Sequence, residues 1–406
     1  MISDRFRWVF CQLDTLRRCM PSSIRKALNE LPISLDDTYE RMLQGIPKEK
    51  FEHASRLFQC MVVAVRPLRV EELAEIFAID FGTNNVPNLV AGWRPENPEE
   101  AVLSTCSTFI TVIDDLGSKI VQFSHFSVKE FLTSDRLAAS DVGTICQFYV
   151  ALEPAHAIFA QACVTILLQL DAEEDKEHVR GLPLAPYATG NWVRHTKFPD
   201  VAPRIQDTLA YLFDPKKPHF RPRILLQGVK NFYLIWPTLF SREPDTVTPL
   251  FLAAYCGFSL LVNHLITMHA LDVNAKCCFG ESPLHGASRS GEVESARILL
   301  DHGADTSAKS YNDYTPLHLA ALYGHLNVVL LLLEDEVNLD AQNGNNETPL
   351  SLASELGHSE IIQTLLDHGA DMNMRTKQGF TPYQIAAQYG HHIVAQRLLE
   401  AGAERG

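Results

Sequence analysis

The sequence predicts a mainly α-helical protein: a small helix-and-hairpin domain, a helical spacer and a C-terminal α-solenoid. Two observations carry this prediction. A short motif recurs five times at intervals of 33 or 34 residues towards the C-terminal end. Elsewhere apolar residues follow helical spacing, apart from one pair of short alternating runs. The 406 residues, 46% of them hydrophobic, are enough for two or three domains, which we place at 1–139, 140–243 and 244–406.

Each repeat begins with Thr or Ser followed by proline, and a glycine stands nine residues later. The hydroxyl caps a helix, proline fits the first helical position, and the glycine ends that helix in a left-handed conformation. A second apolar helix follows, as in Val328–Leu333. One unit cannot bury its apolar face, so the copies must stack. The motifs start at Thr248, Ser282, Thr315, Thr348 and Thr381, and the glycines are Gly257, Gly291, Gly324, Gly357 and Gly390.

The repeats resemble ankyrin repeats, because Thr-Pro-Leu-His, paired leucines and Gly-Ala-Asp recur in register over residues 244–406. The resemblance implies a solenoid that binds a protein partner on its concave face. It also implies that His285 and His318 are structural and hydrogen-bond the neighbouring turn. The sequence departs from the pattern at Phe251, in place of the motif histidine, and at 334–338, where the expected helix end shifts by a residue or two.

The first 139 residues predict helices and one β-hairpin, which together form a winged-helix layout. The hairpin comes from two alternating runs, 109–113 and 119–123. Residues 81–100 are rich in Gly, Asn and Pro and predict a loop. Ser127 is expected to cap the helix that runs through Leu132. The other helices are expected at about 24–31, 35–43, 48–65 and 70–77.

Residues 140–243 predict a helical spacer between the winged-helix domain and the solenoid. Its helices are expected at about 155–170, 185–195 and 205–213. Large aromatic residues in this stretch are expected in a core and not at a ligand site; they are Trp192, Phe213, Phe220, Phe232 and Trp236.

Four segments of the front part are similar to the stretch that follows the nucleotide-binding core in fungal NACHT–ankyrin proteins, which are STAND-type signalling switches. The likeness covers roughly residues 5–240 and implies that His125, followed by Glu130-Phe131, is a vestigial or trans-acting nucleotide sensor. No G-x-x-x-x-G-K-[ST] occurs, so the nucleotide-binding core is expected to be missing from this chain. The segments are Phe6–Asp14, Leu31–Glu40, Arg66–Leu73 and His125–Leu132.

Patterns typical of enzymes and metal sites are missing from the sequence, which has no H-E-x-x-H, G-x-S-x-G or C-x-x-C. The pairs Cys277-Cys278 and His391-His392 are adjacent, so their side chains diverge and do not suit one metal ion. We therefore expect no catalytic residue, metal or cofactor. Nine scattered cysteines predict no disulfide framework, and no apolar run is long enough for a membrane span. A cytoplasmic location is expected, with the nucleus as an alternative.

The negative charge is concentrated in the repeats. Residues 241–406 carry 9 Lys and Arg against 20 Asp and Glu, whereas residues 1–240 carry 26 against 29. Such an acidic repeat region should repel nucleic acid and anionic lipid, so neither is an expected partner. A winged helix can bind DNA, but the front part has a near-neutral balance and no basic recognition helix.

The partner surface is expected beside the turn tips and just before the helix-ending glycines. Aromatic side chains there should have no core to enter, because Ala and Leu positions fill it, and large aromatics ringed by charge anchor interfaces. The predicted partner-binding residues are Tyr255, Phe279, Glu281, Arg289, Tyr311, Asn312, Tyr314, Tyr323, Glu347, Phe380 and Tyr389, with Glu355 as a further acidic position.

The sequence favours a non-enzymatic protein-binding module or scaffold in an intracellular signalling context. The alternative is an incomplete NACHT-type NTPase switch whose nucleotide core is absent or supplied in trans. A third, weaker hypothesis is a winged-helix DNA binder with ankyrin repeats. ATP binding would separate the first two, and salt-dependent DNA binding would test the third.

Overall fold

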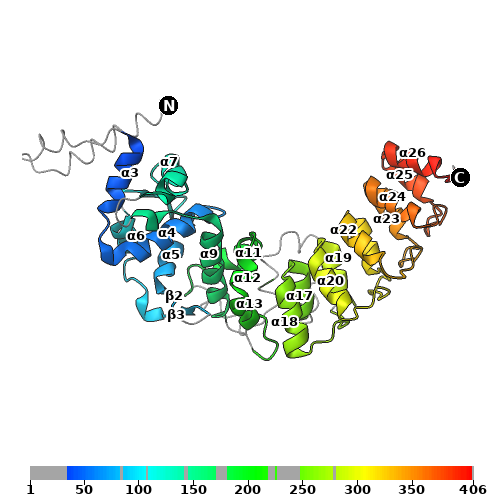
Figure 1. The fold of residues 1–406 in the computed structure, drawn as a ribbon, viewed down its shortest axis with the longest axis horizontal. Helices are drawn as coiled ribbons and strands as arrows, with labels where there is room; N and C mark the ends of the chain where they lie inside the picture. The colour runs from blue at the N-terminus through cyan, green and yellow to red at the C-terminus, as the bar shows by residue number, and fades with distance from the viewer. Residues whose placement is uncertain are drawn as a thin grey trace, which may run out of the picture. The chain divides into compact units, whose positions relative to one another are not determined.

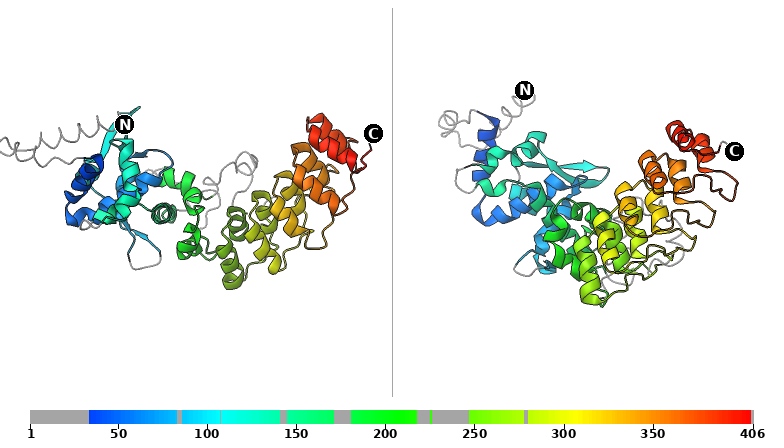
Figure 2. Two further views of the ribbon diagram at one scale, coloured as in Figure 1. Left: turned by 45° about the horizontal axis from the view of Figure 1, so that its top comes forward. Right: turned by 45° about the vertical axis from the view of Figure 1, so that its right-hand side comes forward.

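The structure is a computed structural model that describes residues 34–82, 86–106, 108–140, 145–170, 181–217, 225, 247–277 and 280–404. It is mainly helical with few strands and divides into two compact units, Met1–Thr208 and Leu209–Gly406 (Figures 1 and 2). Several predicted features lie outside the described residues: the helix at 24–31, the segment Phe6–Asp14, and Phe220, Phe232 and Trp236.

The first unit alternates helices and short strands up to Phe123 and is helical from Phe126 onwards. Its α-helices are α3 (Leu35–Gln44), α4 (Phe51–Val63), α5 (Val70–Ala74), α6 (Pro98–Cys106), α7 (Phe126–Leu132), α8 (Asp135–Ala138), α9 (Leu152–Leu167), α11 (Ala185–Thr196) and α12 (Val201–Arg204), with α13 (Gln206–Leu212) at the unit boundary. Its strands are β1 (Leu68–Arg69), β2 (Ile79–Asp80), β3 (Asn88–Leu89), β4 (Ile110–Asp115) and β5 (Ser118–Phe123).

The predicted hairpin is present but belongs to a larger sheet. Strands β4 and β5 pair antiparallel, with Ile110 opposite Phe123. Strand β1 adds to the other edge of β5, with Leu68 opposite Val121, so the wing has three strands and not two. Two residues are too short a run to show alternation, which is why β1 was missed.

The segment 81–100, predicted as a loop, contains structured elements, so that prediction was wrong. Strand β3 pairs with β2, with Leu89 opposite Ile79. Helix α6 begins at Pro98, and the backbone N–H of Glu100 donates to Asn97 Oδ1 (3.2 Å). Asn-Pro therefore starts a helix here, because proline suits the first turn and asparagine caps it.

Helices α9 and α11 belong to the first unit and do not form a separate spacer. Helix α9 packs against both α4 and α11. Hydrogen bonds also join them: the Val65 N–H donates to the Tyr187 hydroxyl (3.0 Å), which bonds His195 Nε2 (2.8 Å), and His195 Nδ1 bonds His156 Nδ1 of α9 (2.9 Å). Residues 140–243 are therefore split by the unit boundary near residue 208. Trp192 and Phe213 are fully buried, as predicted.

A buried carboxylate fixes the Arg66–Leu73 segment. Glu72 is fully buried and accepts two hydrogen bonds from the Arg66 guanidinium (2.7 and 2.8 Å) and one from the Arg69 backbone N–H (2.9 Å). Burial raises the pKa of Glu72, but these donors outweigh it and leave the pKa below its usual range. The charged residues of this motif thus hold the turn between α4 and α5.

The second unit is a stack of five helix pairs along the chain, running from green to red in Figure 1. The first helices of the pairs are α17 (Pro249–Cys256), α19 (Pro283–Ser290), α21 (Pro316–Leu322), α23 (Pro349–Leu356) and α25 (Pro382–Gln388). The second helices are α18 (Ser259–His269), α20 (Val293–Asp301), α22 (Leu326–Leu332), α24 (Ser359–Asp367) and α26 (His392–Glu400). We call the first helices inner and the second helices outer.

Local interactions in the first pair follow the sequence prediction. The Thr248 hydroxyl accepts from the Phe251 N–H (3.2 Å), proline occupies the first helical turn, and Gly257 is left-handed with φ of 76°. Helix α22 ends at Leu332, about two residues earlier than its equivalents, as the departure at 334–338 indicated.

Candidate functional site

Four turns between the helix pairs share one hydrogen bond and one left-handed position, and we call them fingers: residues 277–281, of which 278 and 279 lie outside the described residues, 310–314, 343–347 and 376–380. In each, the first residue's N–H donates to the fifth residue's carbonyl at 2.9 or 3.0 Å. The fourth residue is left-handed: Gly280, Asp313, Asn346 and Gly379. Glycine, asparagine and aspartate tolerate that conformation best. The fifth residues, Glu281, Tyr314, Glu347 and Phe380, are therefore equivalent positions at the finger ends.

Two histidines hold the fingers against the inner helices, which confirms the structural role predicted for them. His285 Nε2 bonds the Tyr314 carbonyl (2.9 Å), and His318 Nε2 bonds the Glu347 carbonyl (3.0 Å). Burial lowers the pKa of both to about 4, so both are neutral at pH 7. Ser351 takes their place in the fourth copy, and its hydroxyl bonds the Thr348 carbonyl instead.

A second histidine series, which the sequence reasoning missed, ties each pair to the one before. His325, His358 and His391 bond the carbonyls of Arg289, Leu322 and Glu355 at 2.9 to 3.1 Å. Each ring lies over a helix-ending glycine, where a Cβ would come within 2.7 Å of it. The signal in the sequence was a histidine following the glycine by one residue in three copies.

Three predicted residues of the second and third copies, Glu281, Arg289 and Tyr323, pack into a closed cluster. Arg289 forms an ion pair with Glu281, donates to the Tyr323 hydroxyl (2.7 Å) and stacks over the Tyr323 ring at 5.1 Å. Burial raises the pKa of Glu281, although Arg289 opposes this. The cluster joins consecutive repeats through side chains that were predicted to bind a partner.

Burial corrects the expectation that these positions have no core to enter. Tyr255 is 8% exposed and Glu281 is 3% exposed, so neither offers an accessible contact. For Glu281, position in the repeat did not reveal the burial, which accompanies an ion pair with Arg289.

Other predicted residues are accessible at the fingers. Tyr311 is 75% exposed, with its ring edge against the preceding finger at Gly280. Asn312 is exposed, and its carbonyl accepts from the Gly344 N–H (2.8 Å), which links one finger to the next. Tyr314 is half-buried, and its ring lies 5.8 Å from that of His318. Phe279 lies outside the described residues.

The fourth and fifth copies form a pocket of about 300 Å³ between their fingers and inner helices. Three predicted residues, Glu347, Phe380 and Tyr389, line it together with Glu355. Phe380 and Tyr389 are 37% and 55% exposed. The sequence reasoning missed the other lining residues, which are Asn345, Thr376, Lys377, Gln378, Ile385 and Gln388.

Hydrogen bonds position the acidic walls of this pocket. Asn343, 3% exposed, donates from Nδ2 to Glu347 Oε2 (2.7 Å) and accepts from the Glu347 N–H (2.9 Å). On the other wall, a hydrogen bond to the Glu355 carboxylate raises the pKa of the Tyr389 hydroxyl. Both carboxylates are therefore held before any ligand arrives.

In the first unit, His125 caps helix α7, a role predicted for Ser127. The Ser127 N–H donates to His125 Nδ1 (3.3 Å), and the Ser127 hydroxyl bonds both that nitrogen (2.5 Å) and the Tyr39 hydroxyl (2.9 Å). The capping prediction was wrong by two residues because an imidazole nitrogen serves as the acceptor. A nucleotide-sensing role of His125 stays a prediction.

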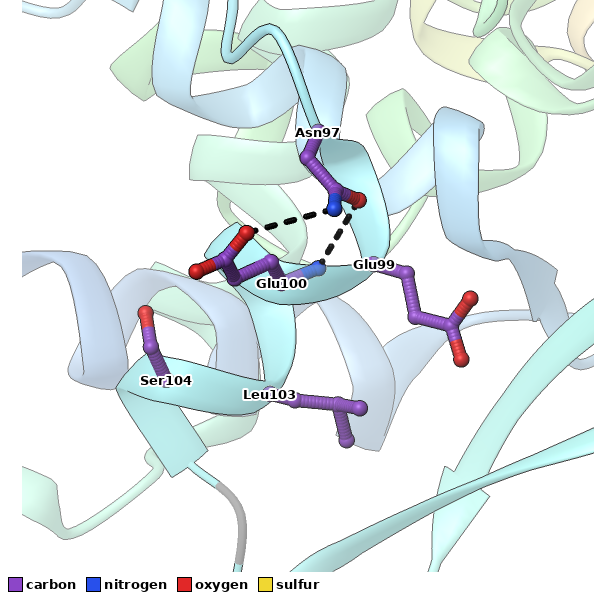
Figure 3. A pocket seen from close by; sticks show the side chains of 5 residues that line it. All are labelled: Asn97, Glu99, Glu100, Leu103 and Ser104. Carbon is purple, nitrogen blue, oxygen red and sulfur yellow. Dashed lines mark hydrogen bonds between the residues drawn. The ribbon is translucent and has the colours of Figure 1, made fainter.

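A shallow hollow in the first unit is lined by one helix start (Figure 3). Asn97 and Glu100 bond each other there as cap partners at 3.2 Å, and Glu99 pairs with Lys119 (2.6 Å). Asn97 and Glu100 thus form a helix cap, and Glu99 belongs to a surface ion pair. The residues that line this hollow therefore do not form a pair suited to acid–base or nucleophilic catalysis. Over the part of the chain that the structure describes, no group of three or more metal-ligating side chains gathers, and no helix is long and apolar enough to cross a membrane.

Comparison with known proteins agrees with the geometry. Residues 250–343 and 336–405 match the family described as "Ankyrin repeats (3 copies)". The second unit is an ankyrin-repeat array. Residues 39–143 match "GPI inositol-deacylase, winged helix domain", so the first unit contains a winged-helix domain.

A relative described as "Azaphilone pigments biosynthesis cluster protein L", from Monascus ruber, is 27% identical over 290 residues. The matched part covers 68% of this chain and 60% of the relative. Together with the two family matches, this likeness supports a resemblance to the C-terminal part of a fungal ankyrin protein. Neither family match includes a nucleotide-binding core.

Proposed function

We propose that this chain is a protein-binding module that uses the fingers and inner helices of its ankyrin repeats, the concave face of such arrays, as its partner surface. Ankyrin repeats generally mediate protein–protein binding. The observation that carries the proposal is the pocket between the fourth and fifth copies, where the exposed aromatic rings of Phe380 and Tyr389 stand beside two positioned carboxylates. Accessible aromatic residues of this kind anchor protein interfaces.

The proposed role is non-enzymatic and belongs to a signalling or scaffold protein. The proposed contact set comprises the exposed residues Tyr311, Asn312, Phe380 and Tyr389 and the half-buried residues Tyr314 and Glu347. Arg289 and Tyr323 support it indirectly, since they hold consecutive repeats together. The NACHT-type switch remains the alternative hypothesis, and nucleotide binding that depends on His125 would favour it.

The test compares the full chain with two double variants in quantitative recovery of bound proteins. Tyr311→Ala with Tyr389→Ala removes two exposed finger-side aromatics. Met268→Ala with Ile393→Ala removes two exposed apolar residues, 70% and 72% exposed, from outer helices α18 and α26. We expect the affinity for a recovered partner to fall at least tenfold in the first variant only, which is equivalent to about 1.4 kcal/mol of binding free energy. Equal recovery from both variants would contradict the proposal.

A further inference from the structure

Two junctions in the repeat array carry the same residue pattern with one change. Glu281, Arg289 and Tyr323 form the closed cluster in the second and third copies. The residues 66 positions later, two repeats on, are Glu347, Glu355 and Tyr389. The glutamate and the tyrosine are therefore retained, and the arginine is replaced by a second glutamate.

The change coincides with a pocket. In the closed junction, the Arg289 side chain occupies the space between Glu281 and the Tyr323 ring and is 9% exposed. In the later junction the equivalent glutamate and tyrosine line a pocket of about 300 Å³, and Glu355 adds another carboxylate to its wall. This volume is at the lower end for ligand pockets, which suits one long side chain.

We propose that this pocket accepts an arginine side chain from a protein partner, placed as Arg289 is placed in the closed junction. The inference rests on the proposed function and names its partner's chemistry. A guanidinium has five N–H donors in one plane, so it can serve two carboxylates while its face stacks on a ring. Arg289 combines an ion pair with stacking on tyrosine in the same way.

The charges around the pocket favour a cation. Glu347 and Glu355 carry two negative charges against the one positive charge of Lys377, which also lines the pocket. Residues 241–406 have 20 acidic and 9 basic side chains, which should attract a basic partner segment over a longer range. Phe380 and Tyr389 add aromatic surface, and a cation over such a ring gains about 0.5–1 kcal/mol at an exposed site.

The experiment measures binding of fluorescent nine-residue peptides to the full chain. One mixture has a central arginine and randomised flanks; matched mixtures have citrulline, the uncharged analogue, or lysine at the centre. We expect the arginine mixture to bind at least about fivefold more tightly than the citrulline mixture, and more tightly than the lysine mixture. Binding that does not distinguish arginine from citrulline overturns the inference.

Two charge-matched variants locate the effect. Glu355→Arg should fill the pocket from within, as Arg289 fills the closed junction, and abolish the arginine preference without unfolding the chain. Glu360→Arg makes the same charge change at an exposed position on outer helix α24 and should leave the preference intact. Equal losses in both variants would assign the preference to overall charge and overturn the pocket site.

The failure of this inference is distinguishable from the failure of the proposed function. If the Tyr311 and Tyr389 double variant loses its partner but no peptide preference exists, the finger surface binds a partner of other chemistry and the arginine site is wrong. If the folded Glu355→Arg variant keeps the arginine preference, the site is also wrong.

Discussion

The junction between the second and third repeats is closed by side chains, whereas the equivalent junction between the fourth and fifth repeats contains a pocket. In the first, Arg289 joins Glu281 and Tyr323 into a buried cluster; in the second, the equivalent Glu355 leaves a pocket beside Glu347 and Tyr389. The first-to-fifth hydrogen bond of the fingers is the same in both, and Thr315, Thr348 and Thr381 cap their helices alike. The equivalent inner-helix position therefore carries arginine in the closed junction and glutamate in the accessible one.

The two junctions also differ in how their fingers are held. His285 bonds the finger at 310–314, and His318 bonds the finger at 343–347. Ser351 stands at the equivalent position of the fourth copy, and the Phe380 carbonyl accepts from the Thr376 N–H of its own finger (3.0 Å). The finger at 376–380 is linked to its neighbour through the Lys377 N–H and the Asn345 carbonyl (2.9 Å). Of the two fingers that line the accessible junction, the one at 343–347 is therefore bonded by a histidine and the one at 376–380 is not.

The largest expected effect is a loss of stability in acid that begins at the fingers bonded by these histidines. Burial lowers the folded-state pKa of His285 and His318 to about 4, whereas in the unfolded chain they titrate near 6.5. Their stabilisation is therefore complete above pH 6.5 and is lost as the pH falls towards 4, by on the order of 3 kcal/mol for each histidine.

Hydrogen exchange at a series of pH values checks this prediction. Amides of α19 and α21 should lose protection in acid before those of α23 and α25, and replacing both histidines with glutamine should remove the difference. If amide protection is lost at the same pH along the whole array, the histidines do not cause a difference in acid stability between the junctions.

The second expected effect separates the equivalent positions Arg289 and Glu355. Arg289→Ala leaves the Glu281 carboxylate buried without its ion-pair partner, which typically costs about 3 kcal/mol or more. Glu355→Ala removes a residue from a pocket wall and should change the free energy of unfolding by less than about 0.5 kcal/mol. Urea unfolding of both variants measures the difference, and similar losses would mean that the junctions are equally closed.

The smallest effect concerns the two tyrosine hydroxyls. Tyr323→Phe removes the acceptor of the Arg289 hydrogen bond and should cost about 1 kcal/mol of stability. Tyr389→Phe, at a residue 55% exposed, should leave stability almost unchanged. Unfolding curves give the free energy of unfolding of both variants. A larger loss of stability in Tyr389→Phe than in Tyr323→Phe would contradict the assignment of closed and accessible junctions.

Much of the fold could be predicted because its signals are local. The Thr-Pro start and the glycine nine residues later fix each inner helix through a cap and a left-handed residue, both within one turn of the affected backbone. Strand β1 and the cap at His125 could not be predicted in this way. The first is two residues long, and the second depends on which nitrogen of an imidazole accepts a bond.

The candidate site was only partly predictable, because its residues meet across repeats. Glu347, Phe380 and Tyr389 were identified from their positions, but Lys377 and Gln388 were not. Tyr255 and Glu281 were expected to be accessible and are buried. For Glu281, the burial accompanies the ion pair with Arg289 of an inner helix. Comparing residues two repeats apart would have revealed the exchange of arginine for glutamate from the sequence alone.

The most direct test of a partner surface at the fourth and fifth repeats is site-specific photo-cross-linking with the full chain. A benzophenone amino acid replaces either Gln388, at the pocket, or Gln396, on outer helix α26; both glutamines are exposed. We predict that position 388 cross-links to a partner peptide containing arginine close to the attachment point, and that position 396 does not. Equal cross-linking at both positions, or partner peptides without arginine at position 388, would contradict this account.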